Sequence, residues 1–198
     1  HHIYAFNHQD DWDGYVFFSV IHQIMPQDEG RIRAMATSLC FESPLPQIFR
    51  GVGFIPVYLR AYYAKSRKHR NHPERLALVP AATKALLDCC TYIMTDHRQK
   101  IIICPEGTYN KGAPDTLLPI RNGAAEIAHR VAKLDGSVAI TAIAVAYGKK
   151  RHRVVYPRNA SAYVNRPIFV EPGMTVDEIT ELIRKRLQSS VEHAVKLY

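Results

Sequence analysis

Apolar residues occur along this chain in two patterns, short continuous runs and longer runs with a helical period. The short runs, bounded by polar, Gly or Pro residues, are typical of buried β-strands. The predicted strands are residues 3–7, 31–41, 54–59, 101–104 and 138–147, with later strands at Val154-Val155 and within 162–170. The run 101–104 is apolar at all four positions. It therefore predicts a strand that is covered on both faces.

Segments with a helical period lie between these strands. The predicted helices are residues 15–24, 47–50, 73–97, 122–134 and 176–197. Pro73 suits the first turn of the longest helix, in which Pro80 is expected to introduce a kink. Ile179, Ile183 and Leu187 share one face of the last helix. Strands that alternate with helices predict an α/β fold with a mainly parallel central sheet flanked by helices.

The length and hydrophobic content favour one domain over residues 1–198. The sequence has 198 residues, 47% of them hydrophobic, and shows no internal repeat or linker. No apolar run approaches the ~18 to 20 residues of a membrane-spanning helix, so the sequence predicts that the chain does not cross a bilayer. Because the first strand begins almost at once, we expect an N-terminal helix or anchor to precede residue 1.

The charge of the chain predicts an anionic partner. Lys and Arg number 26 against 18 Asp and Glu, which gives a net charge of +8 and a pI near 9.4. Much of the excess lies in the runs Lys65–Arg70 and Lys149–Arg153. Phospholipid headgroups, nucleotides and nucleic acids all fit such a surface. Solvated loops that keep the protein soluble explain each run equally well.

The four cysteines are Cys40, Cys89, Cys90 and Cys104. They form no Cys-x-x-Cys motif, and no His lies at zinc-ligand spacing from any of them. All four sit among apolar residues, so we expect small core residues in a reduced, cytosolic-side protein with no bound metal.

His8 and Asp13 are the first candidates for chemistry. A separation of five residues on a continuous helix would be ~500° of rotation and would point the side chains apart. They meet only across a turn, and the boundary between strand 3–7 and helix 15–24 supplies one, with Gly14 giving local freedom. An Asp carboxylate there would fix the His tautomer and stabilise the imidazolium. The alternative is that Asp10, Asp11 or Asp13 caps the following helix and His8 lies at the surface.

Two motifs in order decide between these interpretations. Asn7-His8-x4-Asp13 resembles the first motif of the glycerol-3-phosphate and lysophospholipid acyltransferase family, and Pro105-Glu-Gly-Thr108 resembles its third. Weaker similarities are Gly51–Ile55 to the second motif, Ile120–Ala125 to the glycine-containing basic segment after the third, and Thr141–Val145 to the fourth. The resemblance spans residues 8–147 and favours the catalytic interpretation of His8 and Asp13.

The resemblance implies a single displacement without a covalent enzyme intermediate. His8 would deprotonate the acceptor hydroxyl, Asp13 would support the charged His, and the oxygen would attack the thioester of acyl-CoA or acyl-carrier protein. No nucleophilic Ser or Cys and no cofactor is required. A backbone N–H in the turn after His8 is a candidate to stabilise the oxyanion. The family's acceptor-binding role transfers to Glu106, Gly107 and Thr108.

The departures from the family pattern concern the acceptor. Val57 and Tyr109 occupy positions where the family usually has Arg residues that contact the acceptor phosphate. Arg60 and Arg121 are shifted cations that could replace them, with Lys111 close by. Arg60 lies three residues beyond Val57, which on a continued strand turns it to the opposite face. The fourth motif also lacks its usual proline.

Three other functions compete with acyl transfer. A non-catalytic lipid- or acyl-binding domain would not need an oriented base. A thioester hydrolase would use water in place of the acceptor. The segment Arg60–Lys65, which interleaves aromatic and basic residues, suggests nucleic-acid binding, but no nucleic-acid-binding signature accompanies it. We therefore expect a cytoplasmic enzyme, peripheral on an anionic membrane, that acylates a lysophospholipid or glycerol phosphate and binds no nucleic acid.

Overall fold

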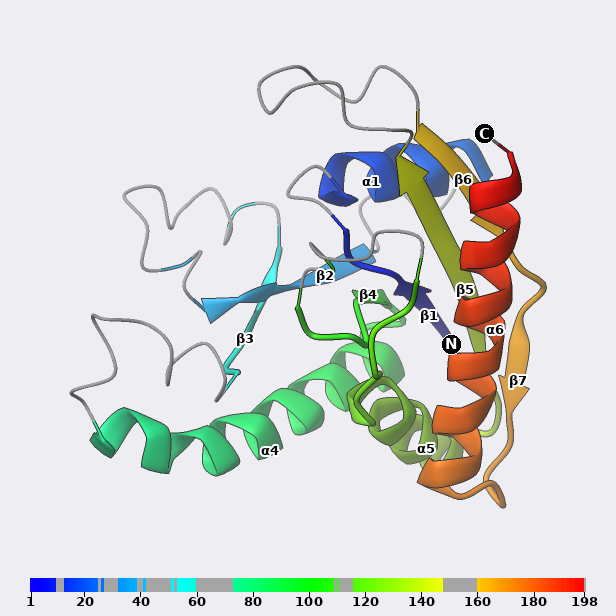
Figure 1. Cartoon of the computed structure of the whole chain (residues 1–198). Helices are drawn as coiled ribbons and strands as arrows, with labels where there is room; N and C mark the ends of the chain where they lie inside the picture. The colour runs from blue at the N-terminus through cyan, green and yellow to red at the C-terminus, as the bar shows by residue number, and fades with distance from the viewer. Residues whose placement is uncertain are drawn as a thin grey trace.

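A computed structural model describes residues 1–9, 13–24, 26, 32–38, 41, 51, 53–59, 73–108, 110, 116–147 and 160–197. Its seven strands form one sheet in the order β3-β2-β4-β1-β5-β6, with β7 also paired to β5 (Figure 1). The strands are β1 His2–Phe6, β2 Ile32–Thr37, β3 Ile55–Val57, β4 Lys100–Ile103, β5 Val138–Tyr147, β6 Ala160–Val164 and β7 Ile168–Val170. The sheet is parallel from β3 to β5 and antiparallel at β6 and β7. The predicted α/β fold with a mainly parallel sheet is confirmed.

Four helices in the described part of the chain cover the two faces of this sheet. They are α1 Asp13–Ile24, α4 Pro73–Thr95, α5 Gly123–Asp135 and α6 Val176–Lys196. Helices α4, α5 and α6 lie on one side of the sheet, and α1 lies on the other (Figure 1). Strand β1 serves both cores, because successive side chains point to opposite faces. Ile3 and Ala5 join the core under α5 and α6, and Tyr4 and Phe6 join the core under α1.

Helix α6 shows how the sequence determines an element. Thr175 and Glu178 form a reciprocal capping box at its start, which satisfies backbone N–H groups that the helix leaves without partners. Ile179, Ile183 and Leu187 are buried against the sheet, on the face that their spacing predicts. The bounds 176–196 therefore agree with the predicted 176–197.

The predicted strand within 162–170 is two strands, β6 and β7. The chain leaves the sheet at Asn165, whose N–H donates to Ala142 O at 2.9 Å, and Pro167 has no N–H to continue a ladder. Strand β5 is long enough for β7 to pair with its beginning and β6 with its end. Residues 47–50, predicted as a helix, and Val154-Val155, predicted as a strand, lie outside the described residues.

Helix α4 bears on the prediction that the chain does not cross a bilayer, which stays a prediction. Leu76–Thr95 is a 20-residue stretch with a mean hydropathy of 1.4, which has the length and composition of a helix that crosses a membrane. Counting continuous apolar runs missed it, because Lys84 and Asp88 interrupt the stretch, and these two form an ion pair at 2.6 Å. Pro80 lies inside the helix and does not end it.

The cysteines also require a correction. Cys90 is fully buried and Cys104 is partly buried, but Cys89 is exposed on α4. Adjacent positions on a helix point about 100° apart, so Cys89 and Cys90 cannot both face the sheet. Cys90 is the one that does. Cys40 lies outside the described residues.

Candidate active site

The candidate site lies where β1 and β4 end at the same edge of the sheet. Because these neighbouring strands are parallel, the turn after β1 and the loop after β4 emerge side by side. Two hydrogen bonds join them: the N–H of His8 donates to the side-chain Oε1 of Glu106 at 2.8 Å, and the N–H of Asn110 donates to the backbone O of His8 at 2.7 Å. The first and third motifs are therefore in direct contact.

His8 and Asp13 face each other across the turn. Nδ1 of His8 lies 2.9 Å from Oδ2 of Asp13, so the predicted approach of the two side chains is confirmed. Asp13 is the first residue of α1, yet its carboxylate turns back to accept the N–H of Gln9 at 2.5 Å. Asp13 is fully buried, whereas 24% of the His8 side chain is exposed. A partly exposed imidazole held by a buried carboxylate can serve as an oriented general base.

Tyr147, the last residue of β5, completes the surroundings of the carboxylate. Its hydroxyl donates to Oδ1 of Asp13 at 2.5 Å, and both groups are buried. Sequence reasoning missed this residue. The available signal was its place at the end of the buried run 138–147, but only the strand order shows that this end lies beside the first motif.

Asn7 fixes the point at which the chain leaves β1. Its side chain donates to Val145 O at 3.0 Å and accepts the N–H of Val145 at 2.8 Å, which extends the pairing with β5 beyond Phe6. The residue is 1% exposed. The amide therefore acts as one more rung of the sheet and holds the backbone just before His8.

The Glu106 side chain joins its own loop to two other backbone segments. Oε1 accepts the N–H of His8, and Oε2 accepts the N–H of Leu118 at 2.9 Å. Burial raises the pKa of this carboxyl group, and the two backbone donors partly oppose that effect. The side chain is 2% exposed. Glu106 therefore supports the site's backbone; its predicted contact with the acceptor stays a prediction.

Gly107 and Arg121 lie next to each other beside the third motif. Gly107 has φ +65°, and a Cβ there would lie 2.8 Å from Arg121 Nε, so the Arg side chain covers the glycine. The N–H of Arg121 donates to Pro105 O at 2.8 Å, which anchors it to the same loop. Arg121 and Thr108 are both exposed.

Not all of the predicted acceptor-binding residues can be placed. Arg60, Tyr109 and Lys111 lie outside the described residues. Val57 is the last residue of β3 and is partly buried.

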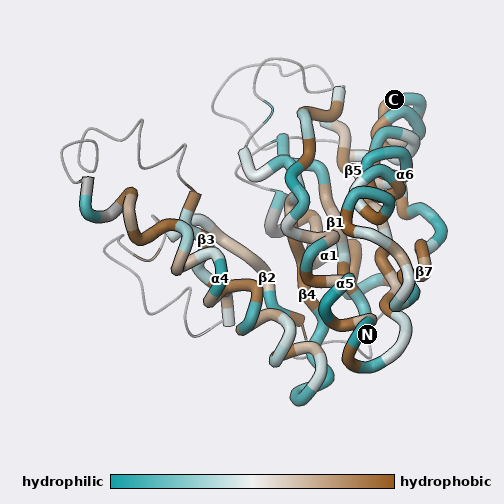
Figure 2. The backbone as a smooth tube through the Cα atoms, turned by 90° about the horizontal axis from the view of Figure 1, so that it is seen from below, coloured by the Kyte–Doolittle hydropathy of each residue, from teal (hydrophilic) through white to brown (hydrophobic). Residues whose placement is uncertain are grey.

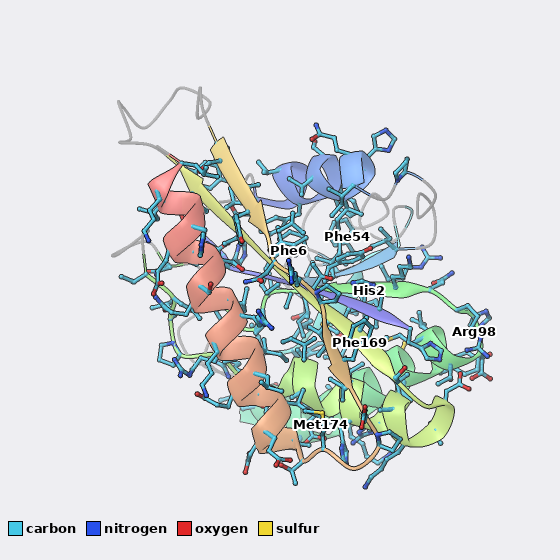
Figure 3. All side chains as sticks on the ribbon, turned by 90° about the vertical axis from the view of Figure 1, so that its right-hand side faces the viewer. His2, Phe6, Phe54, Arg98, Phe169 and Met174 are labelled. Carbon is cyan, nitrogen blue, oxygen red and sulfur yellow. The ribbon has the colours of Figure 1, made fainter. Side chains whose placement is uncertain are left out.

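An apolar cluster underlies the turn that carries His8. Phe6 contacts Phe17 of α1 with ring centroids 3.7 Å apart, and Phe18 meets Phe54 edge to face at 6.2 Å. Figure 3 shows Phe6 and Phe54 on the side of the sheet that α1 covers. No group of three or more His, Cys, Asp or Glu residues able to hold a metal occurs among the described residues.

The structure combines an α/β sheet with a His–Asp pair where β1 ends. The sequence matches the Acyltransferase family over residues 1–148, a range that includes His8, Asp13, Glu106, Arg121 and Tyr147. The chain belongs to this family, and its reaction class is acyl transfer. A search of curated proteins finds no match.

Proposed function

We propose that the protein transfers a fatty acyl group from acyl-CoA or acyl-carrier protein to a hydroxyl of a glycerol phosphate or lysophospholipid. One observation carries the proposal: the fully buried carboxylate of Asp13 orients the partly exposed imidazole of His8. This pair lies in the matched family region, at the edge of the sheet from which both motif-bearing loops emerge.

In the proposed reaction His8 acts as general base and then as general acid. Its Nε2 takes the proton of the acceptor hydroxyl while the oxygen bonds to the thioester carbonyl carbon. The tetrahedral intermediate collapses, the C–S bond breaks, and the thiolate leaves with the proton from His8. Asp13 stabilises the transient imidazolium, and three donors hold its carboxylate in place: His8, Gln9 and Tyr147.

The environment of Cys104 supports a single displacement. This thiol is on the last residue before the third motif, and burial together with the Asp13 and Glu106 carboxylates raises its pKa. A thiol that stays protonated is a poor nucleophile. Transfer directly from donor to acceptor is therefore favoured over a covalent enzyme intermediate.

The acceptor's phosphate would be held by cations near the third motif. Arg121, exposed and lying over Gly107, is the best-placed described candidate, and Arg60 is proposed with it from the sequence. Gly107, where a side chain would displace Arg121, and Thr108 would complete the acceptor site. The enzyme would be cytoplasmic and peripheral on an anionic membrane, from which a lipid acceptor is drawn.

The test is product analysis with purified protein. Palmitoyl-CoA is mixed with a panel of lysophospholipids and glycerol phosphate, and the products are identified by mass spectrometry. We expect an acylated acceptor with wild type, none above background with His8→Ala, and full activity with His97→Ala, which changes an exposed histidine two residues beyond the end of α4.

The same assay separates the alternatives. Free palmitate without an acylated acceptor identifies a thioester hydrolase. Lipid binding without any turnover identifies a non-catalytic binding domain. Equal transfer by wild type and His8→Ala overturns the assignment of the base.

A further inference from the structure

Helix α4 exposes apolar surface over most of its length. Only 11% of its most apolar 18-residue window is buried, and the exposed fractions of Leu78 and Tyr92 are 63% and 53%. Figure 2 shows long hydrophobic stretches along this helix. A helix that is apolar around its whole circumference is ordinarily buried in a core or a membrane. Among its described residues, Cys90, Thr91 and Met94 are the buried ones, and all lie in the last two turns.

The exposed part of α4 borders a hollow next to α5. Leu76, Val79, Pro80 and Leu87 line it, and its volume is about 480 Å³. Lys84 and Arg130 stand at the polar side of this hollow. The Lys84 side chain is 77% exposed, and both cations share Asp88 as a partner. Arg130 also lies 3.9 Å from Glu126, so two cations and two carboxylates border the apolar surface.

The sequence just before α4 carries an excess of positive charge. The run Lys65–Arg70 ends three residues before the helix begins, and the whole chain carries +8. Apolar helical surface flanked by Lys and Arg is the pattern of segments that bind anionic bilayers. Each cation close to such a membrane adds about 1 kcal/mol to binding.

We infer that the first half of α4, in which Leu78 and Pro80 are exposed and Leu76 and Val79 are partly exposed, docks on the surface of an anionic lipid bilayer. The helix lies on the membrane and does not cross it. Its last two turns are packed into the core, which leaves 76–89 as the part with no fully buried side chain, about 21 Å long at about 1.5 Å per residue. A crossing needs about 30 Å. The inference rests on the proposed function only in that a lipid substrate is drawn from the same membrane.

The experiment is vesicle flotation with the full chain. Vesicles contain either phosphatidylcholine alone or phosphatidylcholine with about 30 mol% phosphatidylserine, a content chosen to give a strongly negative surface potential. We expect wild type to float with the anionic vesicles and Leu78→Asp to lose at least about tenfold in partitioning, since a charge enters the apolar contact. Leu197→Asp is the matched control, because Leu197 is also 63% exposed and lies at the end of α6.

Several outcomes decide the inference. Equal flotation of wild type and Leu78→Asp overturns it, as does an equal loss in Leu197→Asp. If wild type self-associates and Leu78→Asp is monomeric with unchanged flotation, the face is a protein interface and the inference fails. Leu78→Gln, which adds no charge, replaces Leu78→Asp if circular dichroism shows that the Asp variant is unfolded. His8→Ala should float like wild type, so failure of the chemistry and failure of the docking are separately visible.

Discussion

The hydroxyl of Tyr147 lies 2.5 Å from Oδ1 of Asp13, while Oδ2 of the same carboxylate faces Nδ1 of His8 at 2.9 Å. Tyr147, at the end of β5, thus supports the His8–Asp13 pair at the turn after β1. The carboxylate is buried and held from two sides, so it has little freedom to rotate away from the imidazole. In the proposed mechanism Tyr147 is a positioning residue, because it acts on the acceptor proton only through Asp13 and His8.

Replacement of Tyr147 by Phe keeps the ring in the core and removes the donor. A hydrogen bond to a charged group contributes about 1.5–3 kcal/mol, so we expect kcat to fall by about ten- to a hundredfold. KM should stay near the wild-type value, since Tyr147 is buried and its hydroxyl donates to Asp13. Steady-state kinetics measures both. The control is Tyr163→Phe, which removes a hydroxyl from β6, where the ring stacks on His193. A fall in both variants would point to general loosening of the sheet.

Asp13→Asn should be more damaging than Tyr147→Phe. The amide can present its NH2 group to a His8 nitrogen and so favour the wrong tautomer, for which a loss of about 10³- to 10⁴-fold in kcat is reasonable. It also turns a donor toward the N–H of Gln9 or the hydroxyl of Tyr147. A thermal melt recorded beside the kinetics checks that the variant is folded. Activity within about threefold of wild type would show that Asp13 does not orient the base.

The contrast between His8 and Tyr147 shows what sequence alone can predict about this site. His8 and Asp13 are five residues apart, so their approach depends on one local turn that the pattern predicted. Tyr147 is 134 residues from Asp13, and its contact depends on β5 lying next to β1, which no local pattern encodes.

The same distinction separates the helices. The bounds of α6 follow from its capping residues and apolar spacing. The exposure of α4 could not be predicted, because periodicity identifies an apolar face and does not say whether another element covers it. Glu106 is intermediate: its motif marked it as important, but its two backbone partners depend on the paired loops after β1 and β4.

The raised pKa of Glu106 predicts how this residue affects stability with pH. Burial raises the pKa of the folded carboxyl above its ordinary value of 4.5, so the folded state keeps the proton to higher pH than the unfolded state. As pH rises from 4.5 through the folded pKa, the unfolded chain ionises first, and this residue's contribution to stability declines. The stability advantage of wild type over Glu106→Gln should therefore shrink as pH rises above 4.5.

Urea unfolding at several pH values measures this advantage, and Glu178 provides a control of opposite sign. Hydrogen bonds from Thr175 lower the pKa of Glu178, so its contribution is present above 4.5 and is lost as pH falls through the folded pKa. The advantage of wild type over Glu178→Gln should grow with rising pH. An advantage over Glu106→Gln that also grows with pH would contradict the expected burial effect.

Gly107→Ala should impair acceptor binding through Arg121. Gly107 has a positive φ, which costs an L-residue about 1–2 kcal/mol, and its new Cβ would lie 2.8 Å from Arg121 Nε. Arg121 must then move, so we expect KM for a phosphorylated acceptor to rise about tenfold if a charge-assisted contact is lost. Gly136→Ala is the matched control, because it has a positive φ with nothing within 4 Å. Equal KM values in the two variants would separate Arg121 from the acceptor.

The thiols give a final check on the single displacement. Burial raises the pKa of Cys90 to about 12, and burial with two nearby carboxylates raises that of Cys104. At pH 8 a thiol with a pKa of about 12 is ionised in about one molecule in 10⁴, so alkylation should be very slow.

In a Cys40→Ser background, iodoacetamide should modify exposed Cys89 first and leave Cys90 and Cys104 intact until the protein is unfolded. Mass spectrometry of Cys89→Ser resolves the adjacent pair. Turnover should survive both the reagent and Cys104→Ala, because the acyl group passes directly between donor and acceptor. An acyl group trapped on Cys104 would instead establish a covalent intermediate. Loss of activity when Cys104 is alkylated would point to the same conclusion.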